Sequence, residues 1–218
     1  MKRLSGKRVL VTSGPTRGRI DVIRYISNIS TGRLGVLIAE EALKREAHVT
    51  FIYGKESQTP HFPPEAERLC LVEVETVDDL IRSVREEMGR TNYDAIVHAM
   101  AVLDYVPETY ISEKTPSGKE EWWIKLVKTP KVIKIIRELA PEAFLIGFKL
   151  EYNRTKEELI RIAHNSLLNN KANLVLANDL ADIERGEHIG YLIDPQGQVV
   201  AVAKGKEEIA KKIIEAIG

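Results

Sequence analysis

Short apolar segments of the kind that form buried strands recur along the chain, and amphipathic segments separate most of them. Each apolar segment is rich in aliphatic residues and ends at a polar or turn-forming residue. We predict six such strands, over Arg8–Ser13, His48–Gly54, Leu69–Val74, Asp94–Val102, Ala143–Leu150 and Ala172–Asp179. Parallel strands need long crossovers, which helices usually supply. The alternation therefore predicts an α/β fold: a Rossmann-like, mostly parallel sheet with helices on both faces.

Helix signals fill most of the intervals between these strands. Ser30 or Thr31 is expected to cap the first helix, and Thr76 the second. Thr129 is expected to cap a third helix, with Pro130 at its first position. The remaining predicted elements are helices over Thr155–Asn169 and Lys206–Ile217, a hairpin over His188–Ala203 and a loop over Gln58–Glu65.

The segment after the fourth strand is long and polar, and we expect it to project from the sheet as a flap. It covers about residues 105–128 and is interrupted by Pro107, Pro116 and Gly118. A hairpin around Ser117–Glu120, with Trp122–Val127 as its return strand, would fit this pattern. No linker or repeat divides the chain, so residues 1–218 are expected to form a single domain.

The composition gives no support for several classes of function. Lys plus Arg and Asp plus Glu both number 32 in the 218 residues, so the net charge is zero. Bulk charge therefore gives no support for binding nucleic acid or a membrane surface, and any basic site must be local. Cys70 is the only cysteine, and no segment reads as a signal peptide or membrane span. A cytoplasmic protein is expected.

Ligands of open parallel sheets bind beyond the carboxyl ends of the strands. Polar clusters follow four of the predicted strands, at Ser13–Gly35, at Asp104 with the flap, at Phe148–Lys149 and at Asn178–Asp179. The first cluster reads SGPTRG after its strand, which is not the G-x-G-x-x-G of a dinucleotide site. A helix beginning near Ser30 could still bind an anion, although a capped helix packed on a strand explains the same residues.

Four side chains in these clusters suit a phosphorylated ligand. Arg24 could hold a carboxylate or phosphate, and Asn28 could donate to a carbonyl oxygen. Asp104 could hold Mg²⁺ that carries phosphates, and Lys114 could close over them from the flap. Each residue also has a plain structural explanation, as a surface arginine, a turn asparagine, a cap or a solvated lysine. The residues alone indicate an α/β enzyme for a phosphorylated ligand, with a nucleotide favoured.

Five blocks in order make a more specific resemblance. They read VLVTSGPTRGRIDVIRYISNISTGRLG, AMAVLDYVP, KLVKTPKVI, IGFKLE and LVLANDL, and they span nearly the whole chain. Together they resemble phosphopantothenoylcysteine synthetase of coenzyme A biosynthesis. In many bacteria that domain is fused to a flavin-dependent decarboxylase, and this chain resembles the stand-alone form, for which no flavin is expected.

The resemblance implies a ligase that joins 4'-phosphopantothenate to L-cysteine. A nucleoside triphosphate, CTP more often than ATP in bacteria, activates the carboxylate as an acyl-nucleotidyl intermediate with Mg²⁺ present. The cysteine amine then displaces the nucleoside monophosphate. No enzyme nucleophile is needed, so positioning and charge stabilisation carry the catalysis.

The resemblance also implies roles for single residues. Asn28 and Lys114 would be catalytic, and Asp104 would lie near the metal and the triphosphate. The substrate-binding residues would be Arg24, Gly14, Ser30, Thr31 and Gly32. The nucleotide-binding residues would be Ala101, Asp104, Phe148 and Lys171.

The chain departs from the family pattern at two places. The flap carries one lysine in EKTPSG, and Asn165 and Asn169 stand where lysines are expected. The family is dimeric, so a homodimer is implied. Two other functions stay open at this point: a Rossmann-like oxidoreductase using NAD or flavin, and a non-catalytic nucleotide-binding module.

Overall fold

A parallel sheet dominates the computed structural model, which describes residues 3–61 and 67–218. In the described residues, eight strands form one sheet in the order β12-β11-β10-β9-β6-β1-β4-β5. Their bounds are β1 Arg8–Ser13, β4 His48–Gly54, β5 Leu69–Val74, β6 Ala95–His98, β9 Phe144–Glu151, β10 Leu174–Asp179, β11 Ile189–Ile193 and β12 Val199–Lys204. The strands from β5 to β10 are parallel, and β11 and β12 add an antiparallel hairpin. The predicted mostly parallel α/β sheet is confirmed.

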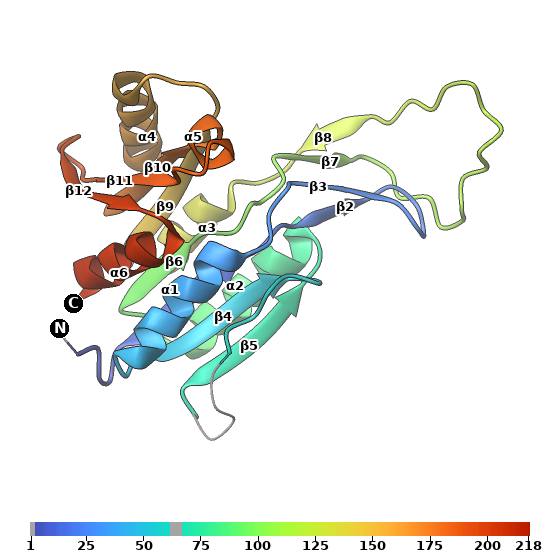
Figure 1. Ribbon diagram of the computed structural model, residues 1–218. Coiled ribbons are helices and arrows are strands. Elements are labelled where there is room, and N and C mark those ends of the chain that lie inside the picture. The colour runs from blue at the N-terminus through green and yellow to red at the C-terminus, as the bar shows by residue number, and fades with distance from the viewer. Residues whose placement is uncertain (1–2, 62–66) are drawn as a thin grey trace.

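Helices cover both faces of this sheet (Figure 1). Two of them, α1 (Arg33–Lys44) and α6 (Lys206–Ile217), pack together on one face. The other face carries α2 (Val77–Arg90), α3 (Val132–Leu139) and α4 (Lys156–Asn170). Alternate side chains of a strand point to opposite faces. Val9 and Val11 of β1 therefore join the core under α1, while Leu10 joins the core under α2.

The strand order reverses direction at β1. From β1 the chain runs outward through β4 and β5 on one side, and through β6, β9 and β10 on the other. A reversal of this kind opens a crevice between the loops at the carboxyl ends of the two central strands. The topology therefore places a ligand site near the ends of β1 and β6.

Two small antiparallel ladders form an arm that extends away from the sheet (Figure 1). The arm, as we use the word, consists of residues 17–27 and 105–128. Its ladders are β2 (Arg17–Arg19) with β3 (Tyr25–Ser27), and β7 (Tyr105–Pro107) with β8 (Leu126–Lys128). The predicted flap hairpin is present at its base, but the return strand is limited to β8. The sequence predicts no strand between Ser13 and Asn28, but β2 and β3 pair there.

Two helix caps differ from the sequence predictions. The cap of α1 is Gly32, at a left-handed φ of 77°, and neither Ser30 nor Thr31. A Cβ at Gly32 would lie 3.0 Å from Ser13 Oγ, so this turn favours glycine. The cap of α3 is Lys131, because the Thr129 hydroxyl donates to the Leu103 carbonyl at 2.6 Å.

Other boundaries agree closely, with one addition. Thr76 and Thr155 cap their helices with reciprocal capping boxes. A short helix, α5 (Leu180–Glu184), follows β10 and was not predicted. Part of the predicted loop over Gln58–Glu65 lies outside the described residues, and its first four residues have no regular structure.

Candidate active site

A cavity of about 720 Å³ opens at the carboxyl ends of β6 and β9. The segment that precedes α3 and the facing side of α4 complete its walls. It is lined by His98, Met100, Ala101, Val102, Asp104, Lys128, Pro130, Lys131, Val132, Ile133, Lys134, Gly147, Phe148, Lys149, Leu150, Ile162, Asn165, Ser166, Leu167, Asn169, Asn170, Ala172 and Val175. The cavity therefore lies at the edge of the sheet where the topology predicts a ligand.

Positive charge gathers around this cavity. Four lysines, Lys128, Lys131, Lys134 and Lys149, line it, and Asp104 is the only carboxylate among the described residues that do so. The Lys131 ammonium lies 2.6 Å from Asp104 Oδ1, and Lys149 lies 2.8 Å from Glu151 Oε1. Because the whole chain has zero net charge, this basic site is local. It suits an anionic ligand.

The inner end of the cavity differs from its rim. We call the inner end the buried lining residues: His98, Met100, Val132, Gly147, Leu167, Ala172 and Val175. All of these except His98 are apolar. The rim carries the exposed side chains, which include three of the lysines and the two amides Asn165 and Asn169. A ligand with one charged and one uncharged end would match this division.

Three of the predicted nucleotide-binding residues, Ala101, Asp104 and Phe148, line the cavity. Asn28 meets the same wall from outside, because its side-chain Nδ2 donates to the carbonyls of Ala101 and Val102 at 3.2 Å each. The fold thus brings together an asparagine and an alanine separated by 73 residues.

The glycine-rich predicted residues support that wall without lining the cavity. The Ala101 N–H donates to the Gly14 carbonyl at 2.8 Å, and Pro15 forms a bridge with Ala101. The Ser13 hydroxyl donates to the Gly32 carbonyl at 2.9 Å. Ser30 and Thr31 precede α1 on the adjoining loop. These contacts hold the start of α1 against the end of β1.

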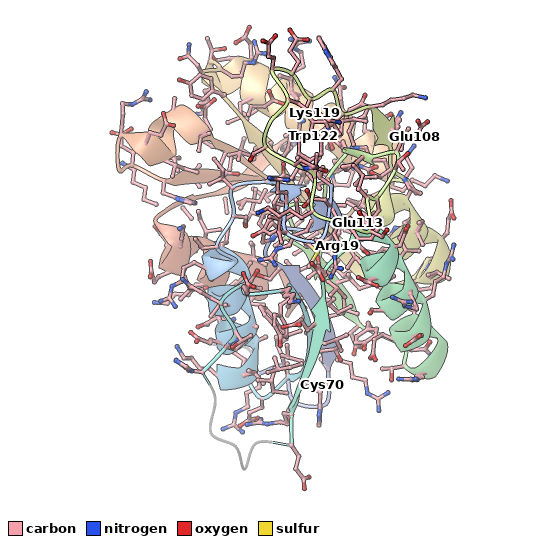
Figure 2. All side chains as sticks on the ribbon, turned by 90° about the vertical axis from the view of Figure 1, so that its right-hand side faces the viewer. Arg19, Cys70, Glu108, Glu113, Lys119 and Trp122 are labelled. Carbon is pink, nitrogen blue, oxygen red and sulfur yellow. The ribbon has the colours of Figure 1, made fainter. Side chains whose placement is uncertain are left out.

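Arg24 and Lys114 lie on the arm. Arg24 Nη1 contacts Asp21 Oδ2 at 2.5 Å and the Thr115 carbonyl at 3.2 Å, and its guanidinium lies over the Trp122 ring. Figure 2 looks at the arm end-on, with the labelled Trp122 on the loop that points toward the viewer. Lys114 is exposed beside Thr115. Neither Arg24 nor Lys114 is among the residues that line the cavity.

Asp21 fastens the β2–β3 turn to the flap. Its carboxylate accepts hydrogen bonds from the N–H groups of Ile23, Arg24 and Thr115. Burial raises the pKa of Asp21, but these backbone N–H groups and the Arg24 guanidinium overcome that effect and lower the pKa to about 2. The arm is therefore one connected unit, made of two segments about 90 residues apart.

Lys171 and the Asn178–Asp179 cluster lie away from the cavity. Lys171 ends α4 at a φ of 51° and borders a neighbouring hollow of about 630 Å³. Its carbonyl accepts from Arg137 Nε at 2.9 Å. Asp179 is buried and accepts from the N–H groups of Asn153, Arg154 and Ala181. Asp179, at the end of β10, thus links the segment after β9 to the start of α5.

Sequence reasoning missed the four cavity lysines. Lys128, Lys131 and Lys134 recur at every third position, and this spacing was a usable signal. The three lysines lie between the end of β8 and the first turn of α3, and all three line the same cavity. Lys149 had been noted only as a polar residue after a strand.

A magnesium ion fits this site as a partner of bound phosphates. Among the described residues, no group of three or more His, Cys, Asp or Glu side chains could hold a metal. Mg²⁺ commonly keeps its waters and binds one or two carboxylates together with substrate phosphates. Asp104, exposed on the rim, supplies one such carboxylate.

No helix in the described part of the chain is both long and apolar enough to cross a membrane.

An open parallel sheet with a basic cavity beside its switch point, at the carboxyl ends of β6 and β9, is typical of Rossmann-like proteins that bind anionic ligands. The sequence adds the family. Residues 4–218 match the model described as DNA/pantothenate metabolism flavoprotein C-terminal domain, and the chain belongs to that family.

Relatives and solved structures agree with this assignment. The coenzyme A biosynthesis bifunctional protein CoaBC of Thermococcus kodakarensis is 38% identical over 216 residues, covering 99% of this chain and 52% of the relative. The chain therefore spans about half the length of that curated relative. The DNA/pantothenate metabolism flavoprotein structure from Streptococcus pneumoniae has a TM-score of 0.86 at 32% identity, with 97% of this chain and 98% of that chain covered.

A Cab2 mutant in complex with phosphopantothenate-cysteine shares the fold. Its TM-score is 0.79 at 21% identity, and the match covers 97% of this chain and 86% of that chain.

Proposed function

We propose that this chain is a phosphopantothenate–cysteine ligase. It joins the carboxylate of 4'-phosphopantothenate to the amine of L-cysteine, using a nucleoside triphosphate through an acyl-nucleotidyl intermediate. The observation that carries the proposal is the basic cavity at the carboxyl ends of β6 and β9, beside the switch point, in a chain of the pantothenate-metabolism family. Relatives named for coenzyme A biosynthesis support the same pathway.

The cavity is proposed to bind the nucleotide. Lysines on its rim offset the charge of the triphosphate, and Phe148 and Ala101 contact the rest of the nucleotide. Asp104 would hold Mg²⁺, which would help to neutralise the phosphates. Asn165 and Asn169 on α4 are neutral, so phosphate binding is assigned to the lysines at the end of β8 and the start of α3.

Asn28 is proposed to position the activated carboxylate. Its Nδ2 donates to two carbonyls of the cavity wall, so the side chain is held next to the nucleotide. Both Nδ2 protons are used in these bonds, so the amide would exchange one of them for the developing oxyanion, without neutralising the electrophile. The substrate-binding residues Gly14, Ser30, Thr31 and Gly32 form the adjoining loop, where N–H groups could receive an anion.

A second copy of the chain is proposed to complete the site. Arg24 and Lys114 are on the arm, which extends away from its own cavity. The arm exposes many large apolar side chains: Val22, Ile23, Tyr25, Tyr105, Tyr110, Ile111, Trp123, Ile124 and Leu126. Apolar surface of this extent suits a homodimer interface. Arg24 and Lys114 of one copy would then serve the cavity of the other.

Pyrophosphate release tests the proposal. Purified protein is incubated with 4'-phosphopantothenate, L-cysteine and Mg²⁺, and each of CTP, ATP, GTP and UTP is added separately. We expect pyrophosphate and phosphopantothenoylcysteine in equal amounts, with CTP used better than ATP. Reactions without phosphopantothenate control for nucleotide hydrolysis. A protein that releases no pyrophosphate with any nucleotide is not this ligase.

A further inference from the structure

His98 is the one polar side chain at the inner end of the cavity, and the proposed reaction gives it no role. It ends β6 and is paired in register with Thr12 of β1. Ile96 and Leu10, two residues earlier on each strand, pack into the core on the α2 face. By the alternation of strands, His98 and Thr12 lie on that same face, which is also the face of the cavity.

The Thr12 hydroxyl determines which ring nitrogen of His98 carries the proton. Thr12 Oγ1 lies 2.8 Å from His98 Nδ1 and accepts a longer bond of 3.4 Å from the Met100 N–H. In the described part of the chain, this hydroxyl has no other hydrogen-bond partner, and Thr12 is fully buried. Its proton therefore has one acceptor, His98 Nδ1. If Nδ1 were protonated, the hydroxyl proton would be buried without a partner, which is costly.

The same argument fixes the other nitrogen of the ring. A neutral imidazole that accepts at Nδ1 carries its proton on Nε2. Burial also lowers the pKa of His98 to about 4, so the ring is neutral at pH 7. Within the described residues, Nε2 has no partner and is not sealed away from the cavity. His98 thus offers one N–H donor to a ligand.

We propose that His98 is a fixed hydrogen-bond donor that positions the nucleobase of the bound nucleotide. This assignment rests on the proposed function. Three of the lysines are exposed on the rim, and the buried residues that line the cavity together with His98 are apolar. A nucleotide bound with its phosphates at the rim brings its uncharged base to the inner end. CTP and ATP both carry ring nitrogens that accept a hydrogen bond.

Two substitutions distinguish the effect of the Nε2–H donor from that of the ring's contact with Thr12. In His98→Gln, the side-chain amide nitrogen extends about as far as Nε2 and can still donate to the ligand. In His98→Asn, the amide extends only about as far as Nδ1, so it keeps the contact with Thr12 but loses the donor. We expect the Kd for CTP or ATP to rise about tenfold in His98→Asn, as for one net hydrogen bond, and to stay near wild type in His98→Gln.

Binding of CTP and ATP is measured by calorimetry, and circular dichroism confirms that both variants fold. Equal affinities in wild type and His98→Asn would overturn the proposal, as would a loss shared equally by both variants. The loss should raise KM for the nucleotide more than it lowers kcat. Binding without pyrophosphate release by the wild type would count against the ligase proposal alone.

The ring nitrogens can also be observed directly in the wild type. We expect ¹⁵N imidazole shifts at pH 7 to show an unprotonated Nδ1 and a protonated Nε2. In Thr12→Val, which removes the hydroxyl at nearly constant shape, this tautomer should no longer be fixed. A wild-type spectrum with a protonated Nδ1 would overturn the assignment, whatever the binding results.

Discussion

The Asn28 side chain joins two segments of the candidate active site. It follows β3 and donates to the carbonyls of Ala101 and Val102, which belong to the segment after β6. A side chain with this position can act on a substrate bound between the two segments. It also leaves no charge there, which suits a reaction at an electrophilic carbon.

We predict that Asn28→Ala lowers kcat for ligation by about 10²–10³-fold, the usual loss for one oxyanion donor. Nucleotide binding should change little, because the substitution leaves the cavity lysines in place. The measurement is steady-state pyrophosphate release beside calorimetric binding of CTP. Asn92→Ala is the matched control, since Asn92 is exposed before β6, at the opposite end of that strand. Wild-type turnover in Asn28→Ala would remove the residue from the reaction.

Asp21 gives the arm a predictable response to acid. Its pKa of about 2 is lower than the ordinary 3.8, so the ionised form stabilises the folded arm. That contribution is complete above about pH 4 and is lost as the pH falls toward 2. Trp122 reports on the same contact, because the Arg24 guanidinium lies 5.3 Å from its ring.

In a Trp123→Phe background, we therefore expect Trp122 emission to stay constant from pH 7 to about pH 4 and to shift below about pH 3. Asp21→Asn should show the shifted emission over the whole range, because the amide cannot replace the charge opposite Arg24. Fluorescence titration of the two proteins provides the comparison. Identical titration curves would contradict the role given to Asp21.

At the level of elements, the start of α1 lies unusually close to the end of β1. A Cβ on Gly35 would lie 2.3 Å from Ser13 Oγ and 2.6 Å from Ser13 Cβ. Ser13 is buried and bonded to Gly32, so it has little room to move. The small residue is needed here for close packing of helix on strand.

We predict that Gly35→Ala lowers the free energy of unfolding by about 1–3 kcal/mol, the range for overpacking. Gly89→Ala is the control in a second helix, because nothing lies within 4 Å of its added Cβ. That substitution should raise stability by about 0.5–1 kcal/mol through the entropy of the unfolded chain. Urea unfolding measures both. A Gly35→Ala protein as stable as wild type would show that the helix can move away from the strand.

Elements with a clear apolar run or helical pattern could be predicted from their own residues. The bounds of β1, β4, β5 and α6 agree with the apolar runs and helix signals that predicted them. The β2–β3 hairpin was missed because RGR and YIS carry no strand pattern, and the pair is held by contacts with distant residues. Arg17, for example, donates its N–H to the Glu75 carbonyl at 2.7 Å.

A residue of the candidate site could be predicted only where its own segment carries a recognisable pattern or motif. Asn28 and Asp104 were proposed from their own clusters, and Ala101 and Phe148 were given nucleotide-binding roles through the resemblance; folding brings all four to the same edge. Thr12 and His98 are 86 residues apart in sequence, and they meet because β1 and β6 pair in this register. No local pattern reports a contact of that kind.

The whole molecule divides into a body that holds the cavity and an arm that exposes apolar side chains. Trp123 is 85% exposed on this arm. If the arm is the homodimer interface, then each site combines Asn28 of one copy with Lys114 of the other. Both the oligomeric state and the pattern of complementation follow from this arrangement.

We predict that Trp123→Ser weakens the dimer, so that sedimentation velocity shows monomer at concentrations where wild type is dimeric. Val200→Ser is the matched control, because Val200 is an exposed apolar residue on β12, at the far edge of the sheet. A mixture of Asn28→Ala and Lys114→Ala chains should regain activity that neither variant has alone. No recovery after the chains have exchanged would argue against a shared site.

Because the base of the arm is paired, the length of the arm's loop does not affect the pairing of the central sheet. Tyr105 pairs with Lys128, and just inside the body the Thr129 N–H donates to the Asp104 carbonyl at 2.9 Å. The ends of the loop are therefore held together before the chain enters the cavity wall. An engineer could graft a longer or shorter connection between Glu108 and Lys125 without changing the register of any central strand. Such a graft would remove Lys114 and Trp122 together with the loop, so the body would keep its cavity and lose the contribution proposed for the arm in the site of a second copy.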